Sequence, residues 1–183
     1  MTDKTDLLSR PKIAIDMDHV MADTGGYLCD WLNTHHGTDV SDESFVTLRR
    51  KTSGAVKQAM LDHVTDGTLM RDLPLMPGCV DAVRELNERF AVVICTAAME
   101  YPNTMAPKLD WLSEHFPFLD SQLFVFCGYK QVMGTDYLID DSPKHFDGFA
   151  GTPLLFDAPH NRDESGYHRV HDWEDVVHYF VNA

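Results

Sequence analysis

The fold is set by one short segment, Ile13-Ala14-Ile15-Asp16-Met17-Asp18-His19-Val20. Its first three residues are apolar and read as a buried β-strand, and carboxylates follow directly at the strand's end. Similar apolar runs recur at residues 91–95, 123–126, 137–139 and 154–156. These runs are continuous and do not alternate with polar residues, as is typical of parallel strands covered on both faces. The segment therefore predicts the first strand of a parallel sheet.

Helical patterns separate several of these strands. One apolar pattern of helical spacing spans residues 80–90, and a second follows Pro107. A third spans residues 173–180, with Asp172 as a candidate N-cap. Strands that alternate with helices predict an α/β fold, here a Rossmann-like parallel sheet flanked by helices.

Residues 24–73 interrupt this alternation. They have helical rather than strand character, and two apolar faces stand out: Tyr27, Leu28, Trp31 and Leu32 form one, and Ala55, Ala59, Met60 and Val64 form the other. We therefore expect a small helical cap inserted after the first strand. On this division residues 1–23 and 74–183 form the α/β core, and residues 24–73 form the cap.

Length and charge narrow the possible partners. The chain has 183 residues, enough for one domain with a small insertion and a core that needs no disulfide. Its 29 acidic residues outnumber 15 basic ones, and the net charge of −14 repels nucleic-acid backbones and anionic membranes. We expect neither nucleic acid nor a membrane as a partner.

Cysteine and histidine usage indicates a reducing compartment and no zinc site. The four cysteines form no CxxC pair, and no HxxxH pattern occurs on a predicted helix. The start of the chain lacks an apolar signal region, and no run approaches the ~18 apolar residues of a membrane helix. We expect a soluble cytoplasmic protein, and the sequence does not indicate its oligomeric state.

Polar residues at the strand ends indicate the chemistry. They are Asp16 and Asp18 after the first strand, Thr96 after the second, Lys130 shortly before the fourth, and Asp140-Asp141 after the fourth. In an open parallel sheet, ligands bind beyond the carboxyl ends of the strands. One fold assumption therefore brings four carboxylates, a hydroxyl and a lysine to the same rim.

Each of these groups has a use in phosphoryl transfer. Crowded carboxylates repel one another unless a cation lies between them, and an oxygen-rich cluster suits Mg²⁺. With Mg²⁺ as cofactor, Asp16 can attack phosphorus and form an aspartyl-phosphate. Asp18 can protonate the leaving oxygen and then activate water.

The phosphoryl oxygens need hydrogen-bond donors as well. Thr96 and the neighbouring backbone N–H groups of Met17 and Ala97 are candidates, and Lys130 can offset charge in the transition state. Alone, a DxD pattern or a threonine at a strand end is usually a helix cap or a turn. The order in which these residues follow successive strands argues against a purely structural role.

Two other classes of protein deserve comparison. A signalling receiver domain also gathers aspartates, a threonine and a lysine around Mg²⁺, but it has no DxD after the first strand and no late Asp-Asp pair. The chain has the hydrolase order. A non-catalytic module that binds a phosphate compound stays open as an alternative.

The strand-end motifs resemble those of the haloacid dehalogenase superfamily of phosphohydrolases, and within it the chain is similar to the 5'(3')-deoxyribonucleotidases. The similarity also includes Met21-Ala22-Asp23, residues 73–78, residues 93–96, residues 136–141 and His160-Asn161. The resemblance implies a Mg²⁺-dependent phosphatase whose small phosphorylated substrate is a deoxyribonucleoside monophosphate. A phosphatase for a different small metabolite is the alternative.

The same resemblance implies roles for single residues. Asp16 would be the nucleophile and Asp18 the general acid and base. Asp16, the backbone carbonyl of Asp18 and Asp140 would bind the metal directly, while Asp141 would act through water or hydrogen bonds. Lys108 falls near a family lysine that approaches the substrate, with a solvated helix lysine as the alternative.

Two positions depart from the family pattern. His19 stands where members often carry glycine, which matters if the backbone there needs a positive φ. We interpret His19 mainly as loop packing, with substrate contact as the alternative. Thr24 stands where pyrimidine-selective relatives have an aromatic residue that stacks on the base, so a pyrimidine preference does not follow. Trp31, Phe45 and Tyr101 are candidates for an aromatic face, although the first two are interpreted chiefly as core of the cap.

Overall fold

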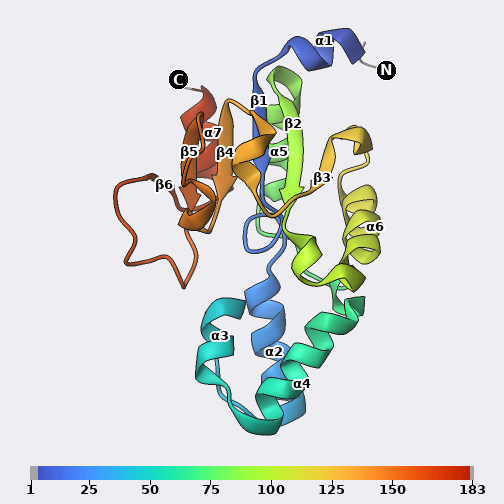
Figure 1. Cartoon of the computed structure of the whole chain (residues 1–183), viewed down its shortest axis with the longest axis vertical. Coiled ribbons are helices and arrows are strands. Elements are labelled where there is room, and N and C mark those ends of the chain that lie inside the picture. The colour runs from blue at the N-terminus through green and yellow to red at the C-terminus, as the bar shows by residue number, and fades with distance from the viewer. Residues whose placement is uncertain (1–3, 182–183) are drawn as a thin grey trace.

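Six parallel strands form the centre of the computed structural model, which describes residues 4–181 (Figure 1). They are β1 (Lys12–Ile15), β2 (Ala91–Thr96), β3 (Phe124–Phe126), β4 (Tyr137–Asp140), β5 (Thr152–Phe156) and β6 (His168–Val170). Their order is β3-β2-β1-β4-β5-β6, and every neighbouring pair is parallel. The predicted α/β fold is confirmed. Residues 1–3 and 182–183, which we assigned to the core, lie outside the described part.

The sequence patterns do not predict β6. This strand has three residues, lies at one edge of the sheet, and buries only Val170. His168 and Arg169 are polar, so the strand carries no continuous apolar signal. The five predicted strands differ from the observed ones by one or two residues at their ends.

The strand order reverses at β1, which lies between β2 and β4. Ile15 pairs with Ile94 of β2 and with Ile139 of β4. The carboxyl ends of these three strands therefore lie side by side, and they bring Asp16, Thr96 and Asp140 to one edge. In open parallel sheets the reversal point is where ligands bind.

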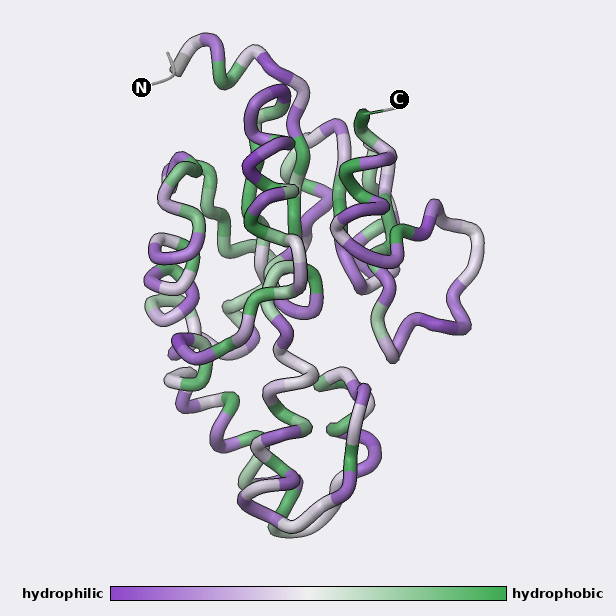
Figure 2. The backbone as a smooth tube through the Cα atoms, turned by 180° about the vertical axis from the view of Figure 1, so that it is seen from behind, coloured by the Kyte–Doolittle hydropathy of each residue, from purple (hydrophilic) through white to green (hydrophobic). Residues whose placement is uncertain are grey.

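Helices pack against the sheet, and the side chains between them are apolar. The longer ones of the core are α5 (Cys79–Arg89), α6 (Met105–His115) and α7 (Trp173–Val181), and α1 (Lys4–Ser9) precedes the sheet. Val83 and Leu86 of α5 and Phe180 of α7 belong to the same apolar cluster as Ile13. Figure 2 shows the hydrophobic colour concentrated along the central strands, while the connection from β5 to β6 is largely hydrophilic.

The helix ends follow local sequence rules. Asp172 caps α7 as predicted, since its side chain accepts a hydrogen bond from Asp175 N at 2.9 Å. The helix predicted to follow Pro107 begins earlier, since α6 starts at Met105. Pro107 lies in its first turn, where proline is tolerated. Short 3₁₀ helices complete the connections: η1 (Thr68–Arg71), η2 (Ala98–Glu100), η3 (Pro102–Thr104), η4 (Ser121–Leu123), η5 (Lys130–Met133) and η6 (Pro143–His145).

Residues 24–73, the helical segment, contain α2 (Thr24–His36), α3 (Phe45–Lys51) and α4 (Gly54–Asp66). These helices lie together at the end of the molecule toward which the strand arrows point (Figure 1). The side chains of Asp23 and Ser44 cap α2 and α3, and α2 and α4 end at glycines in the left-handed region.

The apolar faces of the helical segment are close to those predicted. Leu28 and Leu32 of α2 and Met60 and Val64 of α4 are buried. Ala55 is exposed, which corrects its predicted place on the α4 face. Four residues before Met60, Val56 packs against the core instead, because residues four apart share one face of a helix.

Two further expectations concern the whole chain. The four cysteines are free, and Cys29, Cys79 and Cys95 are buried as small core residues. Among the described residues, no helix combines the length and the apolar character that crossing a membrane requires.

Candidate active site

The loop after β1 folds back directly beyond the strand. Met21 N and Ala22 N both donate hydrogen bonds to Met17 O at 2.9 Å, and His19 N donates to Ala22 O at 2.8 Å. This tight turn gives His19 a φ of 60°, a conformation that residues other than glycine adopt uncommonly. The turn leaves the side chains of Asp16 and Asp18 at the wall of a cavity.

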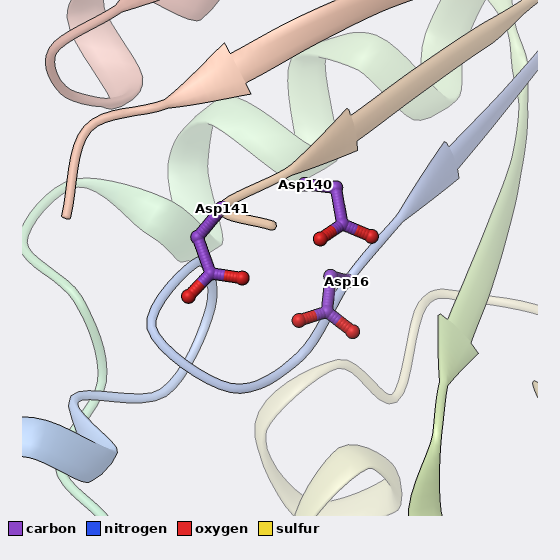
Figure 3. A group of neighbouring side chains, drawn as sticks. All are labelled: Asp16, Asp140 and Asp141. Atoms are coloured by element: carbon purple, nitrogen blue, oxygen red, sulfur yellow. The ribbon is translucent and has the colours of Figure 1, made fainter. Parts of the chain in front are cut away.

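Three carboxylates meet beside this loop. Asp16, Asp140 and Asp141 come from the ends of β1 and β4, and their carboxyl groups lie close together (Figure 3). One oxygen from each lies within 4.8 Å of the others. Lys130 is fully buried beneath them, and its Nζ donates hydrogen bonds to Asp16 and, at 2.6 Å, to Asp140 Oδ2. The predicted meeting of strand ends at one rim therefore occurs.

Burial and charge divide these carboxyl groups into two kinds. Burial raises the pKa of Asp16 to about 6, although Lys130 partly offsets the rise. Burial and the charges of Asp16 and Asp140 hold the pKa of Asp141 well above its usual range. Burial acts on Asp140 too, but Lys130 and a hydrogen bond from His145 outweigh it, and the pKa falls to about 2. When no metal ion is bound, Asp140 is thus the fully ionised one of the three carboxyl groups.

His145 is a site residue that the sequence analysis missed. Its Nδ1 lies 2.8 Å from Asp140 Oδ2, and it must donate because a carboxylate only accepts. Ser142 N donates to the other oxygen of Asp140 at 2.9 Å. Both residues follow the carboxyl end of β4. A search for polar side chains that continued five residues beyond the end of the strand would therefore have found them.

Lys108 lies inside the site and is not a solvated helix lysine. Its side chain is 4% exposed, and its Nζ donates hydrogen bonds to Asp18 and, at 3.0 Å, to Thr96 Oγ1. Thr24 Oγ1 donates to the other oxygen of Asp18 at 3.0 Å. Burial raises the pKa of Asp18, but the charge of Lys108 and these hydrogen bonds outweigh it and lower the pKa.

A cavity of about 160 Å³ opens between the sheet edge and the helical segment. Its lining includes Asp16, Asp18, His19, Thr24, Ala97, Lys108 and Asp141 of the predicted site residues. Met17, Thr96, Lys130 and Asp140 are buried behind this lining. Phe45 and Tyr101 line the cavity too, edge to face with ring centres 6.0 Å apart. Trp31 does not line it and stacks on His63 at 4.4 Å.

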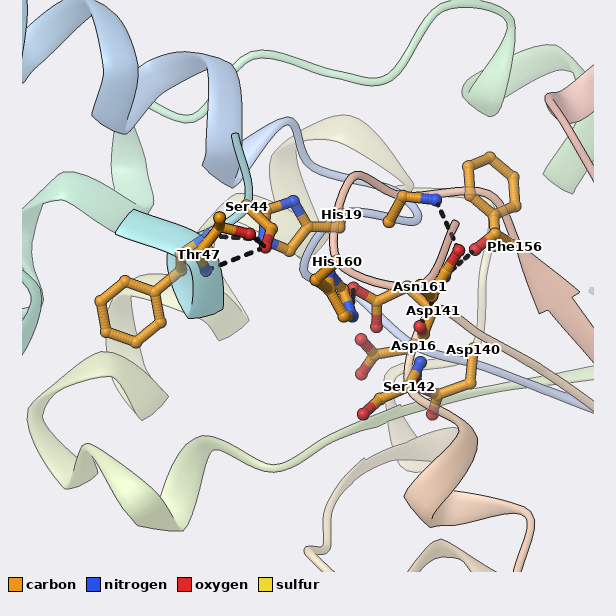
Figure 4. Close-up of polar contacts among 12 residues, drawn as sticks. Asp16, His19, Ser44, Thr47, Asp140, Asp141, Ser142, Phe156, His160 and Asn161 are labelled. Atoms are coloured by element: carbon orange, nitrogen blue, oxygen red, sulfur yellow. Dashed lines mark hydrogen bonds and ion pairs between the residues drawn. The ribbon is translucent and has the colours of Figure 1, made fainter. Parts of the chain in front are cut away.

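Two histidines flank the carboxylates (Figure 4). The ring centres of His19 and His160 are 5.9 Å apart, and His160 Nε2 lies 3.6 Å from Asp141 Oδ2. Burial lowers the pKa of His19 to about 4 and also lowers that of His160. Among the described residues, His160 Nδ1 has no hydrogen-bond partner.

The donor set fits a hard divalent cation. Four buried or half-buried carboxylates face two buried lysines, which leaves an excess of two negative charges when all are ionised. Oxygen ligands at this density are those that Mg²⁺ accepts. Asp141 belongs to the same group of ligand atoms as Asp16 and Asp140, so the geometry allows it to bind directly as well as through water.

Comparisons with known proteins agree with this geometry. The family model described as "5' nucleotidase, deoxy (Pyrimidine), cytosolic type C protein" matches residues 10–183. A 5'(3')-deoxyribonucleotidase of Bacillus subtilis is 35% identical over 167 residues, which are 90% of this chain and 95% of that protein. A Staphylococcus aureus protein, which carries the same enzyme name in provisional form, is 39% identical over 176 residues, or 96% and 98% of the two chains.

Solved structures share the fold at low sequence identity. A haloacid dehalogenase-like hydrolase of Streptococcus pneumoniae has a TM-score of 0.61 and 13% identity, covering 94% of this chain and 99% of its own. A hydrolase of the same class from Bacillus subtilis, bound to magnesium, has a TM-score of 0.55 and 14% identity, with coverages of 95% and 99%.

Proposed function

Because the chain belongs to the cytosolic type C family of 5'-deoxynucleotidases, we propose that it hydrolyses deoxyribonucleoside monophosphates through a phosphorylated Asp16. The observation that carries the proposal is the cluster of Asp16, Asp140 and Asp141 over Lys130, with the Asp18–Lys108 pair beside it. The curated relatives that bear the deoxyribonucleotidase name support this substrate class.

The same proposal divides the chain into a core and a cap. In this proposal the described residues 4–23 and 74–181 form the catalytic core, and residues 24–73 form a cap over the carboxyl ends of the strands. The position of α2, α3 and α4 beyond those ends supports this division, as does the cavity between them and the core. A cap of this kind can close over the bound substrate and exclude bulk water from the site.

The chemistry starts at Asp16. One carboxylate oxygen of Asp16 attacks phosphorus, and the phosphorus–oxygen bond of the ester breaks with its electron pair on the leaving oxygen. Asp18 supplies the proton to that oxygen, and the nucleoside leaves. Water then attacks the phosphorus of the aspartyl-phosphate, Asp18 takes the water's proton, and phosphate and free Asp16 result.

Asp18 must carry a proton before the first step. In the structure Lys108 holds Asp18 as the anion. A substrate phosphate attracts the same ammonium group, which weakens the ion pair and favours protonation of Asp18. Lys108 then holds phosphoryl oxygens together with Thr96 and the N–H groups of Met17 and Ala97.

Mg²⁺ fits beside these groups. Asp16, Asp140 and the backbone carbonyl of Asp18 would hold it, and Asp141 would bind directly or through water. The ion would withdraw charge from the phosphoryl oxygens, so that a carboxylate can approach an anionic ester. A solved structure of the same fold holds magnesium, which supports the assignment. Lys130, which contacts both Asp16 and Asp140, would hold these two ligands in place.

The cavity's size bears on how a nucleotide enters. Its volume of about 160 Å³ is below the roughly 300 Å³ at which sites for drug-sized ligands begin. A whole nucleotide therefore requires an outward movement of the cap, or its base stays at the mouth of the cavity. Phe45 and Tyr101 offer apolar faces in the cavity lining, whereas Thr24 donates a hydrogen bond to Asp18.

The test is a panel of 5'- and 3'-monophosphates of deoxyribo- and ribonucleosides, assayed with and without Mg²⁺. We expect Mg²⁺-dependent release of phosphate, highest with deoxyribonucleotides, and a phosphorylated peptide containing Asp16 after acid quench. Asp16→Asn should lower kcat at least about 1000-fold, whereas the exposed Asp147→Asn should retain it. Full turnover by Asp16→Asn would refute the mechanism, and a preference for sugar phosphates over every nucleotide would refute the substrate.

A further inference from the structure

His19 departs from glycine at a position where the backbone favours glycine. Its φ of 60° is uncommon for a residue with a Cβ, yet the structure places an imidazole there. The backbone of His19 is engaged within the loop, because its N–H donates to Ala22 O. The ring therefore projects out of the loop, and its contacts show what it contributes.

The ring reaches the first turn of α3. His19 Nε2 accepts a hydrogen bond at 3.3 Å from the N–H of Phe45, the first residue of that helix. The first N–H groups of a helix have no partner within the helix. Ser44, which is fully buried, accepts from Thr47 N at 3.3 Å. The start of α3 is thus held by one acceptor from its own cap and one from the loop after β1.

The same ring separates two cavities. His19 lines the active-site cavity of about 160 Å³ and a neighbouring cavity of about 400 Å³, which residues 42–43, residues 157–159 and Arg162 border. Gly25 leaves room for the ring, since a Cβ there would lie 2.8 Å from His19 Cε1 and 2.5 Å from Glu43 O. The imidazole fills the space between the loop after β1, α2 and the entry to α3.

We infer that His19 is a positioning residue that fixes the start of α3 against the catalytic loop, and thereby holds Phe45 against the nucleoside part of the substrate. Phe45 lines the active-site cavity and meets Tyr101 edge to face. If α3 shifts, the apolar wall moves while Asp16 and Asp18 stay in place. The effect therefore belongs to recognition beyond the phosphate, and the identity of that part rests on the function proposed above.

A matched pair of variants tests this role. His19→Phe keeps a ring but removes the acceptor, and His19→Gln restores an acceptor at the position of Nε2. Both carry a Cβ at the same positive φ, so the backbone strain is common to the pair. One hydrogen bond predicts a KM for deoxyribonucleoside monophosphates about 3- to 10-fold higher in His19→Phe. His19→Gln should lie closer to the parent.

Two further measurements separate positioning from direct contact. With acetyl phosphate, which has no nucleoside, KM should differ less than twofold between the two variants. In a Phe45→Ala background, His19→Phe should add little to KM, because the residue through which His19 acts is gone. Amide hydrogen exchange at Phe45 should speed up in His19→Phe and recover in His19→Gln, whether or not substrate is present.

The outcomes of these measurements distinguish a positioning role of His19 from direct contact with the substrate. Unchanged exchange at Phe45 in His19→Phe would overturn the inference. Equal KM increases in His19→Phe and His19→Gln, additive with Phe45→Ala, would overturn it in favour of direct substrate contact. If the parent protein hydrolyses no nucleoside monophosphate, the proposed function fails, while the exchange measurement still decides whether His19 holds α3.

Discussion

At the scale of single residues, one residue type serves several tasks because each copy has different neighbours. Asp140 accepts hydrogen bonds from Lys130, His145 and Ser142, which stabilise its anion. Of these three donors, Asp16 accepts a hydrogen bond only from Lys130. Burial outweighs this lysine and raises the pKa of Asp16 to about 6. At Asp141, burial and the charges of Asp16 and Asp140 outweigh the charge of Lys130, and the pKa lies well above the usual range. Of the three carboxyl groups, Asp140 is thus a preformed anion, whereas Asp16 and Asp141 would have to release protons to bind a metal ion.

This contrast predicts a pH-dependent affinity for Mg²⁺. Ligands must be deprotonated to bind, and a raised pKa means that Asp16 and Asp141 hold protons in the metal-free protein on the acid side. Affinity should fall as the pH is lowered through about 6, the pKa of Asp16, by roughly tenfold per pH unit for each proton displaced, and Asp141 should add to the fall. Titration calorimetry in two buffers of different ionisation enthalpy measures both affinity and protons released.

The control for this titration is Asp16→Asn, in which one exchangeable proton is gone. Its affinity should be lower throughout, with a shallower dependence on pH. An affinity for Mg²⁺ that stays flat between about pH 5 and 7 in the parent protein would contradict the assigned protonation states.

At the scale of elements, the site depends on how the connections after the strands are held. The connection from β5 to β6 is irregular and largely hydrophilic, yet it supports Asp141. Asn161 is fully buried there and donates to the backbone oxygens of Asp141 at 2.7 Å and Phe156 at 2.8 Å. Its own oxygen accepts from Arg169 at 2.8 Å. One amide thereby ties the ends of β4 and β5 to β6.

Removing this amide should loosen the element and the metal site together. Asn161→Ala removes the side-chain donor from two backbone carbonyls of buried residues, so we expect the free energy of unfolding to fall by about 2–3 kcal/mol. Affinity for Mg²⁺ should fall roughly 10-fold, the lower end of what outer groups contribute. Urea unfolding and calorimetry measure the two effects.

Asn103→Ala is the matched control, because Asn103 is exposed and donates one bond to Thr65 O at 3.0 Å. It should change stability by less than about 1 kcal/mol. A stable Asn161→Ala protein with parental metal affinity would show that the connection is held by other contacts.

At the scale of the whole molecule, charge opposes the substrate. The net charge of −14 repels a phosphate dianion at long range, whereas Lys108 and the proposed cation attract it only inside the site. Salt screens long-range repulsion between exposed charges more than short-range contacts in a buried site. Varying the ionic strength can therefore separate the long-range repulsion from the short-range attraction inside the site.

We expect kcat/KM at saturating Mg²⁺ to rise about twofold or more when KCl increases from roughly 20 to 200 mM. The neutralised variant Asp30→Asn, Glu85→Gln, Glu88→Gln removes three exposed charges and should show a smaller rise. Steady-state rates at each salt concentration make the measurement. A fall in kcat/KM with added salt would mean that the local positive field dominates the encounter.

Much of the architecture follows from the sequence alone. Continuous apolar runs identify five of the six strands, because strands buried on both faces leave an unbroken signal. The polar residues that end these strands then identify Asp16, Thr96 and Asp140, since parallel strands share one carboxyl edge. The sequence does not predict β6, because this edge strand has only three residues, two of them polar, and carries no such signal.

The tertiary structure alone decided the contacts between segments that are distant along the chain. Lys108 could be a solvated helix lysine or a site lysine until α6 brings it against Asp18, 90 residues away. Phe45 could be cap core until α3 turns it toward the cavity. His19 could be loop filler until its ring meets the N–H of Phe45. Local patterns report how a residue is buried, whereas a partner far along the chain is set by packing of whole elements, and that packing leaves no periodic mark in the sequence.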